Sequence, residues 1–391
     1  MSNQIEDLRE QIDNLDVSLV SLLNEYLYFP LLIGIIFFFI KKRFTNSKER
    51  ALLTLDINNV KKELAKKEMK DIEHDSAREL EVYEQCLKVQ KLNNGPLPNN
   101  TLVSIFKEIV SASLSINKDV KVSFLGPRGT YSHQAASSRF GDSVLYSKQR
   151  TIADVFRSVE KKESTYGVVP FENSTHGTVT QTIDELIRTP VKVRADLYLP
   201  IHHQFLSKSS DLSEITKIYS HPEALGQCSK WLNTKMRNVE KIPVSSTSYA
   251  AELASKELGA GAICSMVCAD IYGLKVLDRD VEDIKDNTTR FFVIGQSYDG
   301  PSGHDKTVFS FTVDHRQPGA LCNALAVFKE HDINITKIDS RPSHQYHWHY
   351  IFILEIEGHI EDEPLKEAFK ELNDYCVDIN IIGSYPRAKE L

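Results

Sequence analysis

The spacing of apolar residues changes from a helical pattern to a mixed one at Val120. Before that residue, apolar side chains recur in steps of three and four, as they do on one face of a helix. From Val120 onward, short apolar runs such as residues 120–126 alternate with helical stretches. Alternation of this kind favours an α/β domain with largely parallel strands. The sequence therefore predicts an all-α helical N-terminal domain followed by an α/β domain.

A third region follows a linker rich in Gly, Ser and Asp at residues 297–305. Its expected elements are a strand, a helix, two strands, a helix and a strand. This order is that of an α+β ferredoxin-like fold, βαββαβ. The 391 residues are enough for three domains. We expect them at residues 1–117, 120–297 and 306–388.

An apolar segment interrupts the helical domain. Residues 26–40 are apolar and include a proline and a glycine, which suit a helix poorly. If residues 26–49 are skipped, the helical spacing that ends at Leu22 resumes in register at Arg50 and Leu53. The apolar run is shorter than the roughly 20 residues that a membrane-spanning helix needs. We therefore expect residues 26–49 to be a translated intervening sequence, with a membrane anchor as the alternative.

Charge and cysteine usage restrict the partners and the compartment. The net charge is −7 with acidic and basic residues interspersed, so the sequence gives no basic face for nucleic acid. The six cysteines are scattered over a long chain, which is typical of a reducing compartment. The acidic, amphipathic N-terminus has neither a signal peptide nor a transit pattern. These features predict a cytoplasmic protein without a nucleic-acid partner.

Polar residues gather at the expected ends of three strands: 126–136 (GPRGTYSHQAA), 168–179 (VVPFENSTHGTV) and 287–295 (NTTRFFVIG). Open α/β sheets bind ligands at strand ends. The first segment precedes a helix, and backbone amides at such a turn can hold an anion. For that segment alone, an ordinary strand-to-helix turn is the favoured interpretation.

These segments, with 220–228 (SHPEALGQC) and 246–254 (STSYAAELA), resemble the prephenate dehydratase family over residues 120–295. The resemblance implies a two-lobed α/β domain that converts prephenate to phenylpyruvate, carbon dioxide and water without a metal or organic cofactor. It implies that Thr289 donates a proton to the leaving hydroxyl, with Arg290 beside it. The other implied substrate contacts are Asn173, Ser174, Ser220 and Gln227, with Thr130 and Ser132 near the opening loop.

Residues 318–328 and 334–342 resemble an ACT domain, a phenylalanine-sensing module. The resemblance implies L-phenylalanine as an allosteric effector, with Asp339 standing where the family generally has glutamate. A turn around Pro342 that only stabilises the fold is the alternative. The implied effector-binding residues are Gly319, Ala320, Leu321, Asn334, Asp339, Ser340, Arg341 and Pro342.

With residues 26–49 skipped, the helical domain resembles chorismate mutase. Arginines suit the two carboxylates of chorismate because a guanidinium binds them bidentately, and Lys61 and Asn117 would serve the ether oxygen. In the family one arginine comes from a partner chain, which implies a homodimer or homotetramer. The implied mutase residues are Arg9, Arg50, Lys61, Asp75, Arg78, Glu79 and Asn117.

Besides the membrane anchor, two alternatives stay open at this point. The mutase domain could be inactive, which would leave a monofunctional dehydratase. The lobes with the ACT module could form a non-catalytic amino-acid sensor. The histidines at 344, 347 and 349 could suggest a metal, but their spacing is unlike closed zinc sites, so we expect none. Cys264 and Cys268 are expected to pack in the core.

Overall fold

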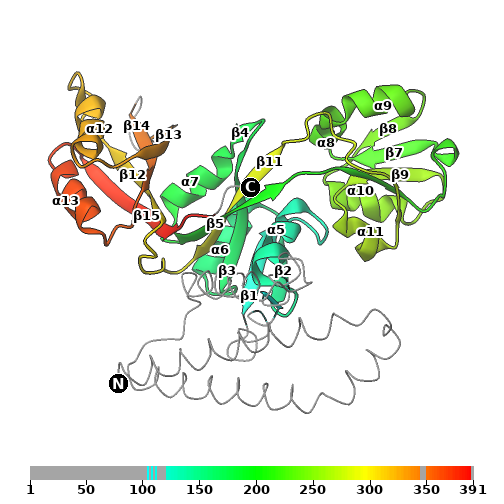
Figure 1. Cartoon of the computed structure of the whole chain (residues 1–391), viewed down its shortest axis with the longest axis horizontal. Coiled ribbons are helices and arrows are strands. Elements are labelled where there is room, and N and C mark those ends of the chain that lie inside the picture. Colours follow the sequence, from blue (N-terminus) through cyan, green and yellow to red (C-terminus); the bar gives the residue numbers. More distant parts are fainter. Residues whose placement is uncertain (1–103, 105–106, 109–110, 112–119, 344–348, 389–391) are drawn as a thin grey trace, which may run out of the picture. The chain divides into compact units, whose positions relative to one another are not determined.

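The computed structural model describes residues 104, 107, 108, 111, 120–343 and 349–388. The chain divides into two compact units, one of residues 1–119 with 140–144 and one of residues 120–139 with 145–391. Apart from residues 104, 107, 108 and 111, the expected helical domain lies outside the described residues, and so do its mutase residues and the segment 26–49. The description below concerns the second unit, which contains three sheets (Figure 1).

The first sheet forms lobe 1 of the α/β domain, with strand order β2-β1-β3-β11-β5 and β4 added at β3. β1 pairs in parallel with β2 and β3, whereas β11 is antiparallel to both of its neighbours. The strands are β1 (Lys121–Leu125), β2 (Leu145–Gln149), β3 (Tyr166–Asn173), β4 (Gly177–Thr178), β5 (Lys192–Pro200) and β11 (Thr288–Gly295). The helices are α5 (Tyr131–Phe140), α6 (Ile152–Glu160) and α7 (Thr180–Arg188).

The second sheet forms lobe 2, with strand order β10-β6-β9-β7-β8. Its strands are β6 (Gln204–Ser207), β7 (Lys217–Ser220), β8 (Glu240–Pro243), β9 (Ala260–Cys264) and β10 (Lys275–Asp278). Its helices are η1 (Leu212–Glu214), α8 (Pro222–Gln227), α9 (Ser229–Lys235), α10 (Thr247–Ala254) and α11 (Val267–Tyr272). β7 pairs in parallel with β8 and β9, whereas β6 is antiparallel to β9 and β10.

The chain passes between the lobes twice, from β5 to β6 and from β10 back to β11 (Figure 1). The expectation of largely parallel strands is wrong, because half of the long pairings in these two sheets are antiparallel. Sequence alternation gives the order of elements but not the direction from which a strand enters its sheet. β11 returns from lobe 2 and therefore runs against β3 and β5.

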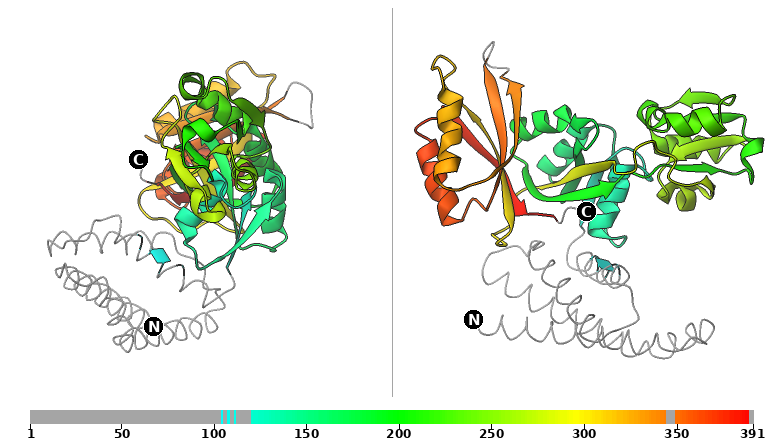
Figure 2. Two further views of the ribbon diagram at one scale, coloured as in Figure 1. Left: turned by 90° about the vertical axis from the view of Figure 1, so that its right-hand side faces the viewer. Right: turned by 45° about the horizontal axis from the view of Figure 1, so that its top comes forward.

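The third sheet has the expected βαββαβ order, with spatial order β13-β14-β12-β15 and antiparallel pairing throughout. Its helices lie on one face of the sheet (Figure 2), where Phe309, Phe328 and Phe369 meet in the core. The ferredoxin-like prediction is confirmed. The elements are β12 (Asp305–Thr312), α12 (Ala320–Glu330), β13 (Ile335–Pro342), β14 (Tyr350–Glu357), α13 (Glu363–Leu372) and β15 (Asp378–Pro386).

Lobe 1 and the third sheet share a hydrophobic core. Phe171 on β3 stacks on Phe292 on β11, and Tyr385 on β15 packs edge-on against Phe292. At the crossing of β15 and β5, a Cβ on Gly383 would collide with the backbone of Val193, so only glycine fits. The strands that carry the site are therefore packed directly against the third sheet. No described helix combines the length and the hydropathy that crossing a bilayer requires.

Candidate active site

Asn173 and Thr289 meet where β3 ends and β11 begins. The two residues are paired in the antiparallel register. Asn173 Nδ2 donates to Thr289 Oγ1 at 2.9 Å and to Asn287 Oδ1 at 2.8 Å, which uses both of its protons. Since Thr289 Oγ1 accepts a hydrogen bond, its own proton remains for another acceptor, and no described residue takes it. Asn173 and Thr289, both named from the family resemblance, are therefore direct neighbours in the structure.

The neighbouring side chains tie the two strand ends together. Asn173 Oδ1 accepts from the backbone N–H of Thr175 at 3.0 Å and of His176 at 3.1 Å, and from Thr175 Oγ1 at 2.6 Å. Ser174 Oγ accepts from the backbone N–H of Thr288 at 3.0 Å. Asn173 and Ser174, both expected to bind substrate, thus have structural bonds of their own. Their bonds fix the turn that leads into the pocket.

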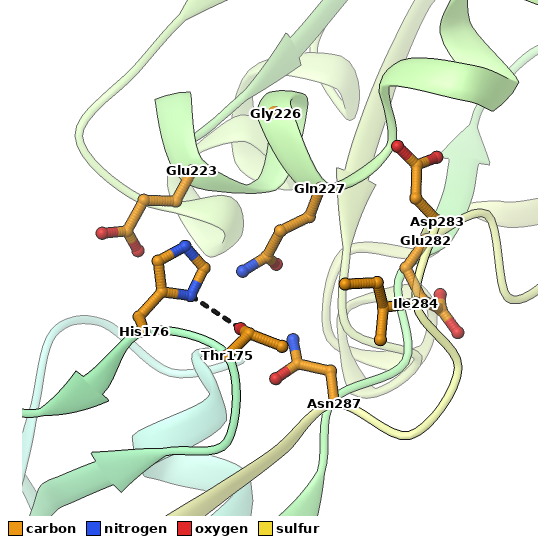
Figure 3. Close-up of a pocket in the computed structure, with 9 residues that line it drawn as sticks. All are labelled: Thr175, His176, Glu223, Gly226, Gln227, Glu282, Asp283, Ile284 and Asn287. Atoms are coloured by element: carbon orange, nitrogen blue, oxygen red, sulfur yellow. Dashed lines mark hydrogen bonds between the residues drawn. The ribbon is translucent and has the colours of Figure 1, made fainter.

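A pocket of about 420 Å³ opens beside this turn (Figure 3). Lobe 1 contributes the turn after β3, and lobe 2 contributes α8. The segment that returns from β10 to β11 contributes the remaining wall. The lining residues are Thr175, His176, Glu223, Gly226, Gln227, Glu282, Asp283, Ile284 and Asn287. The pocket therefore lies between the lobes, with the Asn173–Asn287–Thr289 group at its edge.

Two residues that were not predicted from the sequence, His203 and Tyr131, hold Gln227 in place through a chain of hydrogen bonds. His203 Nε2 lies 2.8 Å from Gln227 Oε1, and Tyr131 Oη lies 2.8 Å from His203 Nδ1. Desolvation by burial lowers the pKa of His203 and raises the pKa of Tyr131, so both side chains are neutral near pH 7. The sequence held a signal for His203, because His202 and His203 follow the end of β5, as the polar residues named above follow the ends of other strands.

The opening loop contacts lobe 2 through its carbonyls. The carbonyl of Gly129 accepts from Ser265 Oγ at 2.8 Å and from Cys268 Sγ at 3.2 Å, and the carbonyl of Arg128 accepts from Ser248 Oγ. Gly129 has a φ of +89°, and a Cβ there would meet Cys268 and Ser248. These contacts favour the interpretation of residues 126–130 as an ordinary turn over that of an anion-binding loop.

Thr130 and Ser132 lie in this region but do not line the pocket. Thr130 Oγ1 donates toward the carbonyls of Pro127 at 2.9 Å and Leu125 at 3.1 Å, which closes the loop on itself. Ser132 is buried in α5. Neither hydroxyl is among the groups that face the space beside Gln227.

Ser220 and Arg290 also lie away from the pocket. Ser220 is fully buried, and its hydroxyl donates to the carbonyl of Ile263 at 2.6 Å, which links β7 to β9. Successive strand residues point to opposite faces, so Arg290 points away from the side of Thr289. Its guanidinium donates to Asp196 at 2.7 Å and to Glu355 at 2.6 Å. Arg290 therefore joins lobe 1 to the third sheet instead of contacting the pocket.

The expected effector residues fall into two groups. Gly319 is the N-cap of α12 with a φ of +83°, followed by Ala320 and Leu321. On β13, Asp339 accepts from Thr178 Oγ1 at 3.2 Å, and Arg341 donates to Asp184 at 2.7 Å. The remaining residues of the set are Asn334, Ser340 and Pro342, at the start and end of the same β13 region. The second group thus contacts lobe 1 of its own chain.

Cysteines and histidines give no further chemistry to the site. Cys264 and Cys268 are buried in the core of lobe 2, as expected. His349 packs against the ring of His315, while His344 and His347 lie outside the described residues. In the described part of the chain, His202, Asp280 and Glu282 bring ligand atoms within 4.8 Å of one another. Glu282 already accepts from the backbone N–H of His203 at 2.8 Å, and we assign no metal there.

Comparison with known proteins agrees with this architecture. A family model described as prephenate dehydratase matches residues 122–298, and one described as ACT domain matches residues 307–374. A bifunctional chorismate mutase/prephenate dehydratase of Aquifex aeolicus is 39% identical over 386 residues, which cover 98% of each chain. The chain belongs to this bifunctional family. The Pseudomonas aeruginosa protein of the same description is 33% identical over 99% of this chain and 98% of its own.

Two solved structures share the fold of this family member. The prephenate dehydratase of Arthrobacter aurescens in complex with L-Phe aligns with a TM-score of 0.63 at 29% identity, over 69% of this chain and 90% of its own. GqqA, described as a novel type of quorum quenching acylase, aligns with a TM-score of 0.63 at 26% identity, over 68% of this chain and 98% of its own. One fold thus carries different activities, and the pocket residues must supply the argument for the reaction.

Proposed function

We propose that the enzyme converts prephenate to phenylpyruvate, with Thr289 as the proton donor. The bond from the ring to its carboxylate breaks, and its electron pair enters the ring. The ring becomes aromatic and expels the hydroxyl with its bonding electrons, and the proton of Thr289 completes a water molecule. A proton from solvent then restores the Thr289 hydroxyl, so that the net reaction takes up one proton. The products are phenylpyruvate, carbon dioxide and water, so no oxidant or cofactor is required.

One observation carries this proposal: the 2.9 Å hydrogen bond from Asn173 Nδ2 to Thr289 Oγ1. A threonine hydroxyl is an ordinary alcohol and a weak acid. A hydrogen bond to its oxygen stabilises the alkoxide that forms as the proton leaves. Asn287 holds Asn173 in place from the other side. The arrangement therefore favours proton donation by Thr289 to a group bound at the edge of the pocket.

The direct test is the formation of phenylpyruvate from prephenate by the full-length enzyme. An enzyme forms phenylpyruvate with saturation kinetics, whereas a non-catalytic amino-acid sensor forms none. Thr289→Ser keeps a hydroxyl at the same position and should retain turnover within about tenfold, whereas Thr289→Ala should lose about 10²- to 10⁴-fold in kcat. An equal loss of kcat in both variants would show that the Thr289 hydroxyl is not the proton donor.

The N-terminal region is proposed to be an all-α chorismate mutase domain that supplies prephenate. The support is the description of the curated relatives, which match 98–99% of the chain. The proposed substrate-binding residues are the arginines, Lys61 and Asn117 named above. We compare chorismate consumption by the full chain with that of a chain lacking residues 26–49. Activity in the shortened chain alone would identify the segment as an interruption.

Feedback control by L-phenylalanine at the ACT domain completes the proposal. It is supported by the ACT match and by the described L-Phe complex of the Arthrobacter protein. We place the enzyme in the cytoplasm as a homodimer or homotetramer, consistent with its family and with its scattered cysteines. Inhibition of phenylpyruvate formation by L-phenylalanine, lost on substitution at Gly319, tests the effector site.

A further inference from the structure

Two amide side chains face the pocket with their donor groups unused. Asn287 is 2% exposed, and its Oδ1 accepts from Asn173 at 2.8 Å. Gln227 uses its Oε1 to contact His203 at 2.8 Å. No described residue accepts a hydrogen bond from the NH₂ group of either amide, and both residues line the pocket. A buried NH₂ without an acceptor is costly, which applies to Asn287, whereas Gln227 is partly buried. A ligand oxygen in the pocket is the expected partner of both NH₂ groups.

The orientation of each amide follows from its neighbour. Asn173 can only donate through Nδ2, which requires the oxygen of Asn287 on that side and turns its NH₂ toward the pocket. In Figure 3 the nitrogen of Asn287 points toward Thr175, and the nitrogen of Gln227 points toward His176. The two donor groups therefore come from opposite walls of one pocket.

The orientation of Gln227 depends on the tautomer of His203. Because Gln227 Oε1 carries no proton, the 2.8 Å contact requires a proton on His203 Nε2. Neutral His203 then has an unprotonated Nδ1, which accepts from Tyr131 Oη at 2.8 Å. The carbonyl of His202 is the more distant acceptor for the same hydroxyl, at 3.0 Å. Tyr131 and His203 thus fix which end of the Gln227 amide faces the pocket.

Most of the other polar groups of the pocket are carboxylates, which do not donate hydrogen bonds when ionised. The two amides are therefore the main donors available to a ligand there. Glu282 accepts from the backbone N–H of His203, and Asp283 accepts from Ser229 Oγ at 2.7 Å and from the backbone N–H of Lys230 at 3.0 Å. In Figure 3 these two carboxylates lie on the side of Ile284 away from His176, whereas the carboxylate of Glu223 lies beside His176. The space between the two amides is therefore left for an acceptor group of the ligand.

We propose that Asn287 and Gln227 bind a carboxylate of the substrate through their NH₂ groups, and that His203 and Tyr131 are positioning residues for Gln227. This inference rests on the proposed function for the identity of the substrate. It adds Asn287 as a substrate-binding residue. It also assigns to Asn173 a second task, that of orienting Asn287, besides its hydrogen bond to Thr289.

The test uses isosteric variants of the full-length enzyme, each made in a Thr289→Val background so that prephenate is bound with little turnover, and prephenate binding measured by calorimetry at pH 8. Asn287→Asp keeps the acceptor for Asn173, and Gln227→Glu keeps the acceptor for His203, but each replaces the donor by a carboxylate oxygen. Loss of a hydrogen bond to a charged group predicts a rise in the prephenate Kd of about 10- to 100-fold. Asn233→Asp, on the exposed face of α9, makes the same charge change and should stay within about threefold of the Thr289→Val parent.

The positioning role is tested by two substitutions of His203. His203→Gln can place an N–H where Nε2 lies, whereas His203→Asn can only replace the Nδ1 side. The Kd should rise about tenfold in His203→Asn and less than about threefold in His203→Gln. Equal effects in the two variants would overturn the positioning role, and unchanged binding by Asn287→Asp and Gln227→Glu would overturn the carboxylate site. If wild type binds prephenate without forming phenylpyruvate, the proposed reaction fails while the binding inference is still decided by the variants.

Discussion

The lobes contact each other through neutral hydrogen bonds, whereas the ACT domain contacts lobe 1 through ion pairs. The lobe contact consists of the Arg128 and Gly129 carbonyls with their hydroxyl and thiol donors, and of Tyr131 with His203. The regulatory interface, as we call the second contact, adds three ion pairs to the shared apolar core described above: Arg290 with Glu355, Lys337 with Glu172, and Arg341 with Asp184.

This difference indicates which contact can open. A neutral hydrogen bond contributes about 1 kcal/mol and exchanges readily with water. A buried charge left without its partner costs several times more. The regulatory interface is attached at Glu172 and Arg290, which adjoin Asn173 and Thr289 in sequence. Movement of the ACT domain would therefore reach the strand ends that carry the proposed proton donor, while the lobes remain free to open around substrate.

The largest expected effect comes from removing the cation of the buried cluster. Arg290→Met leaves Asp196 and Glu355 without their shared partner, although Lys306 still contacts Glu355 at 3.0 Å. The free energy of unfolding should fall by about 3–5 kcal/mol, measured by urea denaturation.

The matched control is Lys366→Met, which removes the cation of an exposed pair with Glu363. Its effect should stay below about 0.5 kcal/mol. Similar losses in the free energy of unfolding would mean that the buried ion pair of the regulatory interface stabilises the fold no more than an exposed pair does.

The second effect is a dependence of stability on acid. Burial raises the pKa of Glu355, but attraction to Arg290 and Lys306 outweighs it and lowers the pKa to about 2. A carboxylate with a lowered folded-state pKa stabilises the fold above its ordinary pKa near 4.5, and this contribution is lost as the pH falls toward 2. The contribution is about 3 kcal/mol. Urea denaturation of wild type and Glu355→Gln should give free energies of unfolding that converge as the pH falls from 6 to 3. A difference that stays constant over this range would contradict the lowered pKa of Glu355.

A smaller effect is expected at the lobe contact. Ser265→Ala removes the 2.8 Å hydrogen bond to the Gly129 carbonyl, but Cys268 still donates to the same oxygen. The free energy of unfolding should fall by about 1 kcal/mol. A loss as large as that of Arg290→Met would show that the lobes are held as firmly as the ACT domain.

The smallest effect on stability is expected at Lys337, which lies 2.7 Å from Glu172 and is partly exposed. Lys337→Met should change the free energy of unfolding by less than about 1 kcal/mol. It should nevertheless weaken inhibition by L-phenylalanine several-fold, because the link to the end of β3 is lost. Inhibition curves for wild type and Lys337→Met measure this, and identical curves would exclude this contact from feedback.

The sequence predicts the part of the site that lies at strand ends in recognisable segments. Asn173, Gln227 and Thr289 were named because the segments that contain them resemble motifs of the prephenate dehydratase family, and two of these segments also end or begin strands. Arg290 was misplaced because strand alternation turns it to the face opposite Thr289, toward Glu355. Asn287 was missed because its partner depends on the return of β11 from lobe 2, and element order does not give the direction of that strand. His203 and Tyr131 were missed because their contacts with each other and with Gln227 join segments that are far apart in the sequence.

The most direct test of the account is the turnover of Thr289→Val, which matches threonine in shape but has no hydroxyl. The KM for prephenate should stay within about threefold of wild type, since Asn287 and Gln227 remain. The rate of phenylpyruvate formation at saturating prephenate should fall by about 10² or more. Turnover within tenfold of wild type would show that the proton comes from another group and would contradict the account.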